Sequence, residues 1–109
     1  MAVRHDIGSL GELLASAFLL ERGCLLIERN VIIDGGELDL IVDDAGRVVV
    51  VEVKTSSNGD DPIEAVSDTK AVRVRRAADG YRLIVDRIDV ITVEIDRRGV
   101  TIRWLPGAL

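Results

Sequence analysis

The first apolar residues of the chain recur with a helical period. Positions three and four apart are apolar, which predicts a helix, and they are Leu10, Leu13, Leu14, Ala17 and Phe18. Ser9 and Glu12 fit a capping box at the start of this helix, and Gly23 fits its end. Leu19 and Leu20 lie off the stripe, so we expect a helix that is apolar almost all round and buried against a sheet.

Three predicted strands follow this helix. Residues 25–33 are apolar and β-branched and end at Asp34-Gly35, a hairpin-turn signal. Residues 37–42 alternate, which puts one set on each face: Leu38, Leu40 and Val42 against Glu37, Asp39 and Ile41. Residues 47–55 contain four consecutive valines, which indicates a central strand covered on both faces.

The second half of the chain predicts another helix and two more strands. After a polar loop at residues 55–62, Ser67 or Asp68 caps a helix that reaches about Tyr81, with Gly80 near its end. The apolar stripe of this helix is Val74, Ala77, Ala78 and Tyr81. Strands are expected at residues 87–95 and 100–105, joined by a turn at 96–99. This order predicts a single α/β (α+β) domain over residues 1–109, with helices packed on one mixed sheet.

Composition narrows the class of protein. Apolar runs such as Val48 to Val51 are far too short to span a membrane, and the N-terminus lacks the apolar segment of a signal peptide. Cys24 is the single cysteine and is interpreted as a small buried hydrophobe, because one Cys and one His can form neither an internal disulfide nor a zinc cage. We therefore expect a cytoplasmic protein.

The net charge limits how the chain can bind nucleic acid. A formal charge of -5 argues against binding by bulk charge, although it leaves room for a local basic face around an acidic metal site. Aromatic residues make up 3% of the chain, which argues against a base-stacking platform.

Charged residues inside apolar strands are the informative ones. Glu52 and Lys54 end the most apolar strand and lie two apart, so both point to one face. A loop of even length before that strand, such as residues 43–46, puts Asp39 on the same face. Two carboxylates beside an ammonium suit Mg²⁺ or Mn²⁺, which would polarise a phosphate while Lys54 holds the attacking water or stabilises the transition state. The alternative is a partly buried ion pair tied to Asp39 or Arg29.

Lysine usage adds a further candidate. The chain has 12 Arg and only 2 Lys, so Lys54 and Lys70 mark places where a compact ammonium matters. Lys70 shares the core-facing stripe of the second helix and could reach Glu52, or its ammonium could simply extend to solvent. Glu12 could supply a third acid to the metal site, although its capping role is sufficient to explain it.

A basic face is expected on the second helix. Arg73, Arg75 and Arg76 are candidate phosphate contacts, and a solvated helix face is the alternative interpretation.

Several blocks of the sequence together resemble the YraN-type family of small bacterial proteins. These blocks run Gly8-x-x-Gly11-Glu12, Arg29-Asn30, Gly36-Glu37-Leu38-Asp39-Leu40-Ile41, Val51-Glu52-Val53-Lys54-Thr55, Lys70, Ala77-Ala78-x-x-Tyr81 and Arg87-x-Asp89-Val90. The resemblance covers essentially the whole chain. That family is assigned to the PD-(D/E)xK nuclease-like superfamily, near Holliday-junction resolvases and restriction endonucleases.

The resemblance implies a restriction-endonuclease-like αβββαβ core and a site built from these residues. Asp39, Glu52 and the Val53 carbonyl would hold Mg²⁺ or Mn²⁺, and Lys54 would be the catalytic lysine. Glu12 would be the additional helix acid and Lys70 a helper on the second helix. By analogy, nucleases of this fold are often homodimers.

Two functional hypotheses follow. The first is a metal-dependent endonuclease that hydrolyses DNA, including branched or structured DNA. The second is a catalytically silent module that keeps the nuclease fold and binds nucleic acid or a protein. A third and weaker interpretation is a structural protein in which the polar strand residues form a salt-bridge network.

Overall fold

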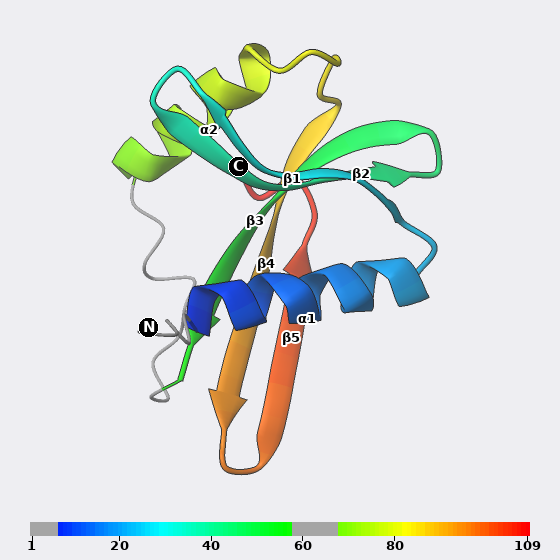
Figure 1. The fold of residues 1–109 in the computed structure, drawn as a ribbon, viewed down its shortest axis with the longest axis vertical. Helices are drawn as coiled ribbons and strands as arrows, with labels where there is room; N and C mark the ends of the chain where they lie inside the picture. Colours follow the sequence, from blue (N-terminus) through cyan, green and yellow to red (C-terminus); the bar gives the residue numbers. More distant parts are fainter. Residues whose placement is uncertain (1–6, 58–67) are drawn as a thin grey trace, which may run out of the picture.

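The computed structural model describes residues 7–57 and 68–109, and these form one mixed sheet with a helix on each face (Figure 1). The elements are α1 (Ile7–Glu21), β1 (Leu25–Ile33), β2 (Gly36–Asp44), β3 (Arg47–Ser56), α2 (Asp68–Asp79), β4 (Arg87–Asp96) and β5 (Gly99–Leu105). The five strands lie in the order β1-β2-β3-β4-β5. Only β3 and β4 run parallel, and α2 lies in the connection between them. The predicted fold class, element order and mixed sheet are confirmed.

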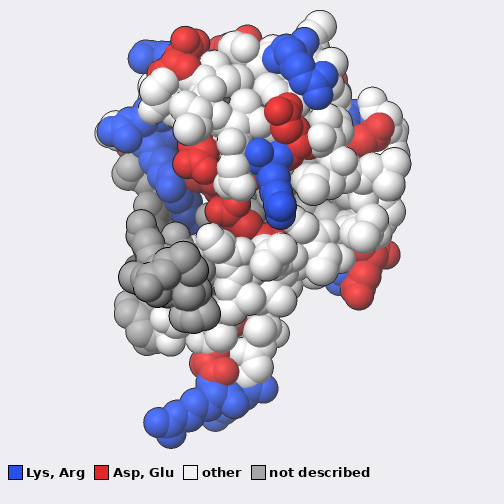
Figure 2. All heavy atoms as spheres, viewed as in Figure 1, with Lys and Arg blue, Asp and Glu red and all other residues white. Residues whose placement is uncertain are grey.

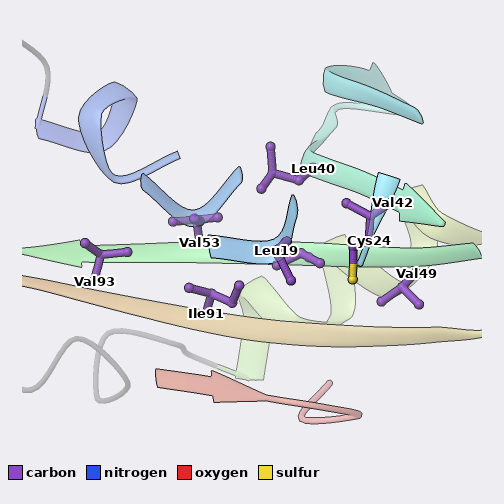
Figure 3. Close-up of a cluster of buried hydrophobic side chains, with 10 residues drawn as sticks. Leu19, Cys24, Leu40, Val42, Val49, Val53, Ile91 and Val93 are labelled. Carbon is purple, nitrogen blue, oxygen red and sulfur yellow. The ribbon is translucent and has the colours of Figure 1, made fainter. Parts of the chain in front are cut away.

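Each face of the sheet carries its own apolar cluster. The face under α1 is filled by Ala15, Leu19, Cys24, Leu40, Val42, Val49, Val51, Val53, Ile91 and Val93, most of which are labelled in Figure 3. The face under α2 is filled by Leu38, Ile41, Val50, Val74, Ala77, Ala78, Tyr81 and Ile88. The consecutive valines of β3 therefore point alternately into both clusters, as expected of a central strand. Cys24 is buried, as predicted.

The buried face of α1 differs from the predicted stripe. Gly11, Ala15 and Leu19 are buried, whereas Leu10 and Leu13 are 47% and 57% exposed. The reason is close packing on β3, because a Cβ at Gly11 would lie 1.8 Å from the Thr55 Oγ1. Small residues therefore select the face that approaches the sheet, and the helix is not buried all round.

The ends of α1 give one confirmation and one correction. Gly23 has φ +89, and the N–H groups of Gly23 and Cys24 donate to the carbonyls of Leu20 and Leu19. This pattern is a Schellman motif, so the predicted C-terminal glycine is confirmed. The capping box is wrong, because the helix begins at Ile7 and Ser9 lies inside its first turn.

The β1–β2 hairpin turns as predicted but bends away from the rest of the sheet. Asp34 and Gly35 have φ values of 50 and 77, as a two-residue type I′ turn requires. The predicted alternation in β2 is broken, because Leu38 packs under α2 whereas Leu40 packs under α1. Gly36 allows this bend, since a Cβ there would lie 3.2 Å from the Ala77 Cβ on α2.

The α2 helix presents the predicted apolar residues to the sheet. Val74, Ala77, Ala78 and Tyr81 are all buried, although the helix itself ends at Asp79. Ser67 and most of the predicted loop at 55–62 lie outside the described residues, and β3 continues through Ser56. Neither α1 nor α2 is long and apolar enough to cross a membrane.

Candidate functional site

The strands β2 and β3 separate at one end of their ladder, and the candidate site lies in that fork. Their pairing ends at Leu40 opposite Val51, whereas β3 stays paired with β4 to its last residue. One position beyond the ladder, the Asp39 Oδ2 accepts a hydrogen bond of 2.8 Å from the Val53 N–H. The Asp39 side chain thus replaces the backbone acceptor that β2 no longer supplies. Because the N–H and C=O of a strand residue point to the same neighbour, the Val53 carbonyl also faces the fork.

The β2–β3 turn sets the register that brings the acids together. Ala45 and Gly46, with φ values of 53 and 88, form a two-residue turn. This turn is shorter than the four-residue loop considered from the sequence, but both lengths are even. Asp39 and Glu52 therefore share a face of the sheet, as the even loop predicts.

Glu52 is buried and its two oxygens have different surroundings. The residue is 2% exposed. Its Oε1 lies 3.4 Å from the Lys54 Nζ and 3.2 Å from the Lys70 Nζ. Its Oε2 is buried and has no hydrogen-bond donor within the described part of the chain. A buried carboxylate oxygen without a partner is destabilising, so this atom marks a place for a proton or a cation.

The buried, acidic surroundings of Glu52 also shift the pKa of Asp39. Burial, chiefly, and then the negative charge of Glu52 raise the pKa of Asp39 to about 8, although the Val53 N–H opposes this rise. Glu12 adds a smaller contribution in the same direction. Without a cation, a proton on Asp39 is what can supply the donor that the Glu52 carboxylate lacks.

The α2 helix forms a basic wall beside these acids. A cavity of about 490 Å³ is lined by Asp39, Glu52, Lys70 and Arg73 together with neighbouring residues of the β1–β2 hairpin and α2. Lys70 and Arg73 are three residues apart, so they lie on one side of the helix. Arg75 is exposed and does not line this cavity.

Arg76 is likewise exposed outside the cavity, so of the three predicted arginines only Arg73 borders the acids. Figure 2 shows acidic and basic side chains close together between the β1–β2 hairpin and α1. The candidate cavity itself has Asp39 and Glu52 beside Lys70 and Arg73, so it is a mixed-charge cleft on an acidic protein.

Glu12 lies beside this cleft but is engaged elsewhere. Its Oε1 accepts a hydrogen bond of 2.7 Å from the Asn30 Nδ2, and it lines a neighbouring cavity of about 330 Å³. Within residues 7–57 and 68–109, no group of three or more His, Cys, Asp and Glu side chains is gathered closely enough to hold a metal ion. The expected gathering of three acids at one point is therefore not seen, and Asp39, Glu52, Lys54 and Lys70 form the assembled set.

These residues nevertheless fit a hard divalent cation. The Glu52 Oε2 lacks a hydrogen-bond partner within residues 7–57 and 68–109, Asp39 has a raised pKa, and the Val53 carbonyl faces the same fork. Mg²⁺ is often bound by one or two carboxylates, with water and substrate phosphate completing its octahedral shell. Two carboxylates and one carbonyl are sufficient protein ligands for such a site.

Two further polar residues lie buried in β4. Thr92 is fully buried, is in register with Lys54, and its Oγ1 has no hydrogen-bond partner among the described residues. Asp89 is fully buried as well, but its oxygens accept hydrogen bonds from Arg87, Trp104 and the Gly107 N–H. Asp89 is therefore a structural anchor for the C-terminal segment.

The residue that sequence reasoning missed is Asn30. It was noted only as part of a family-like block, yet it connects the helix acid to β2. A strand residue in the left-handed region, with φ 52, was not visible in the sequence pattern.

The element order α-β-β-β-α-β-β on one mixed sheet defines an α+β domain, consistent with the core that the family resemblance implies. Comparison with known proteins then gives the family. The chain belongs to the uncharacterised protein family UPF0102, whose model matches residues 11–93.

Relatives from several bacteria match nearly the full chain. A UPF0102 protein of Nocardioides sp. is 38% identical over 93% of this chain and 88% of its own length. A UPF0102 protein of Solibacter usitatus is 41% identical over 93% of this chain and 83% of its own length. Another, from Corynebacterium efficiens, is 44% identical over 85% of this chain and 81% of its own length.

Proposed function

We propose that this protein is a Mg²⁺- or Mn²⁺-dependent endonuclease that hydrolyses phosphodiester bonds in DNA, with branched or structured DNA as the preferred substrate. The observation that carries the proposal is the Glu52 Oε2, which is buried beside Asp39 and has no hydrogen-bond partner among the described residues, with the Lys54 ammonium on the same carboxylate. We propose that the protein acts in the cytoplasm and that the active species is a homodimer. Light scattering at the concentration of the cleavage assay tests the oligomeric state.

The acids and the carbonyl form the cation-holding part of the proposed site. Asp39 and Glu52 would supply carboxylate oxygens, and Val53 would supply its carbonyl. A cation bound there would act as a Lewis acid on a phosphate and would lower the pKa of water. It would also offset both burial and the repulsion from Glu52, which raise the pKa of Asp39.

The two lysines, Lys54 and Lys70, would stabilise the negative charge of the substrate phosphate. Lys54 is 9% exposed, and its ammonium lies 3.4 Å from the Glu52 Oε1. Held there, it can donate a hydrogen bond to the attacking water and stabilise negative charge on the phosphate in the transition state. Lys70 has a side chain that is 42% exposed, so it can contact a phosphate arriving from solvent.

The proposed reaction is a hydrolysis, and water and the phosphodiester are its only reactants. The water oxygen forms a bond to phosphorus as the bond from phosphorus to the leaving sugar oxygen breaks. One proton leaves the water and one joins the leaving oxygen. The products are a phosphate monoester and a hydroxyl.

The test combines binding and cleavage. Mn²⁺ titration by calorimetry is followed by cleavage of four-way junction, flap and plain duplex DNA. We expect Glu52→Gln and Lys54→Met to lower the cleavage rate by roughly 100-fold or more. Glu94→Gln, at a partly exposed position of β4, is the matched control and keeps wild-type activity. Undiminished activity in Glu52→Ala and Lys54→Ala would show that this site does not perform the reaction.

The catalytically silent module is the second candidate. It is favoured by the net charge of -5 and by the absence of a three-acid cluster among the described residues. This candidate predicts salt-sensitive DNA binding without any Mn²⁺ binding. The proposed endonuclease predicts both.

A further inference from the structure

Asn30 has an unusual backbone for a residue inside a strand. Its φ is 52, in the left-handed region that Asn tolerates better than most residues. It lies between the pairs Arg29–Leu40 and Val31–Leu38, so it stands opposite Asp39. A residue in this conformation persists only where its surroundings hold it, and such residues cluster at functional sites.

The side chain of Asn30 joins three elements. Its Nδ2 donates to the Glu12 Oε1 of α1 at 2.7 Å and to the Glu37 Oε1 of β2 at 3.2 Å. A primary amide has two N–H donors, so one neutral group can serve two carboxylates without neutralising either. The amide therefore holds both carboxylates in place without adding charge.

These two acids border the candidate site. Glu37 lines the same cavity as Asp39 and Glu52, and Glu12 lines the adjoining one. The two carboxylates that Asn30 holds therefore lie around the fork between β2 and β3.

Stability alone does not account for this arrangement. Both hydrogen bonds of Asn30 are exposed to solvent, where such bonds contribute little to folding. A residue other than glycine in the left-handed region destabilises the backbone. A structural role would be better served by a residue with ordinary strand geometry.

We propose that Asn30 is a positioning residue of the candidate site. Its amide holds Glu12 and Glu37 as a second layer of negative charge beside Asp39, and this layer strengthens divalent-cation binding by Asp39 and Glu52. This inference rests on the proposed function, because it needs a cation at that pair. Outer residues that orient or surround metal ligands typically change metal affinity by roughly 10–100-fold.

The main test uses Asn30→Gly, which keeps the left-handed backbone and removes the amide. Asp34→Gly is the matched control, because it changes another left-handed residue, with φ 50, in the β1–β2 turn. Mn²⁺ titration calorimetry is the readout, and thermal unfolding checks that each variant folds. We expect Asn30→Gly to weaken Mn²⁺ binding roughly 10-fold and Asp34→Gly to leave it unchanged.

A double-mutant cycle separates positioning from a general effect on the fold. If Asn30 acts through Glu12, Glu12→Gln weakens binding by a similar factor, and the double variant is little weaker than either single variant. Glu12→Gln and Glu37→Gln keep an acceptor for the amide, so they also test the proposal should Asn30→Gly fail to fold. In that case, wild-type Mn²⁺ affinity in both glutamine variants overturns it.

The outcomes distinguish the two proposals. Wild-type protein that binds Mn²⁺, together with Asn30→Gly that binds it equally well, overturns the role of Asn30 alone. The role of Asn30 is also overturned if the double variant loses Mn²⁺ affinity by the product of the two single-variant factors, because the two residues then act independently. Wild-type protein that binds no Mn²⁺ overturns both this inference and the proposed endonuclease.

Discussion

Replacing Asp39 by Asn is expected to remove a pH-dependent instability of the metal-free protein. The pKa of Asp39 is raised from 3.8 to about 8 in the folded state. Between these values the folded chain keeps a proton that the unfolded chain has lost, so stability falls as pH rises. The loss ends once the pH exceeds the folded-state pKa.

The size of this effect follows from one proton. Stability changes by about 1.4 kcal/mol per pH unit while one extra proton is held. From about pH 6 to pH 7.5 the metal-free protein should therefore lose roughly 2 kcal/mol, or about 10 °C in Tm for a domain of this size. In Asp39→Asn the amide is neutral at every pH, can accept from the Val53 N–H and can donate to Glu52, so this contribution to the slope disappears.

The assay is thermal unfolding followed by circular dichroism, in EDTA and in Mn²⁺. Mn²⁺ should stabilise the wild type more at pH 7.5 than at pH 6, because it binds the ionised carboxylates, and should stabilise Asp39→Asn little. Asp79→Asn, at the exposed end of α2, is the control and should keep the wild-type slope. Parallel pH profiles for wild type and Asp39→Asn would refute the assignment of a shared proton to this pair.

Three other predictions address substrate contact, packing and anchoring. Arg73→Ala should raise the KM for DNA roughly 10-fold and lower the salt slope of binding by about 1, because it removes a phosphate contact at the cavity, whereas Arg75→Ala should leave both nearly unchanged. Gly11→Ala should destabilise the fold by about 2–3 kcal/mol in urea unfolding, since its Cβ would meet Thr55, and Thr55→Ala should restore part of that loss. Trp104→Phe should lower stability by roughly 1.5–3 kcal/mol through a lost hydrogen bond to the buried carboxylate of β4, while Mn²⁺ affinity stays at the wild-type value.

Local rules in the sequence were sufficient for the order of the strands and for the Asp34-Gly35 turn. The turn before Arg47 is shorter than predicted, but its length is also even, so the register still brings Asp39 close to Glu52. The orientation of α1 was not available in this way. A helix that is apolar on most of its surface has no strong preferred face, and the contact of Gly11 with Thr55 decides it only in three dimensions.

Long-range contacts account for the rest of the candidate site. Lys70 reaches Glu52 only because α2 covers the β2–β3 fork, and the sequence offered this contact as one of two alternatives. Asn30 joins three elements that are separated by 18 and 7 residues along the chain. No periodicity within one element encodes such a link.

Burial of charge in a strand is a weaker indicator of function than the lack of partners for that charge. Glu52 and Asp89 are both acids at least 98% buried in central strands, so by burial they are equivalent. Three donors satisfy the Asp89 carboxylate, and such a group stabilises the fold without any ligand. The Oε2 of Glu52 has no such donor in the part of the chain that the structure describes, and a proton or a cation there would recover the free energy that burial costs. The physical sign of a site in this fold is therefore the unsatisfied oxygen at the strand fork, and this difference between the two buried acids is visible only in the structure.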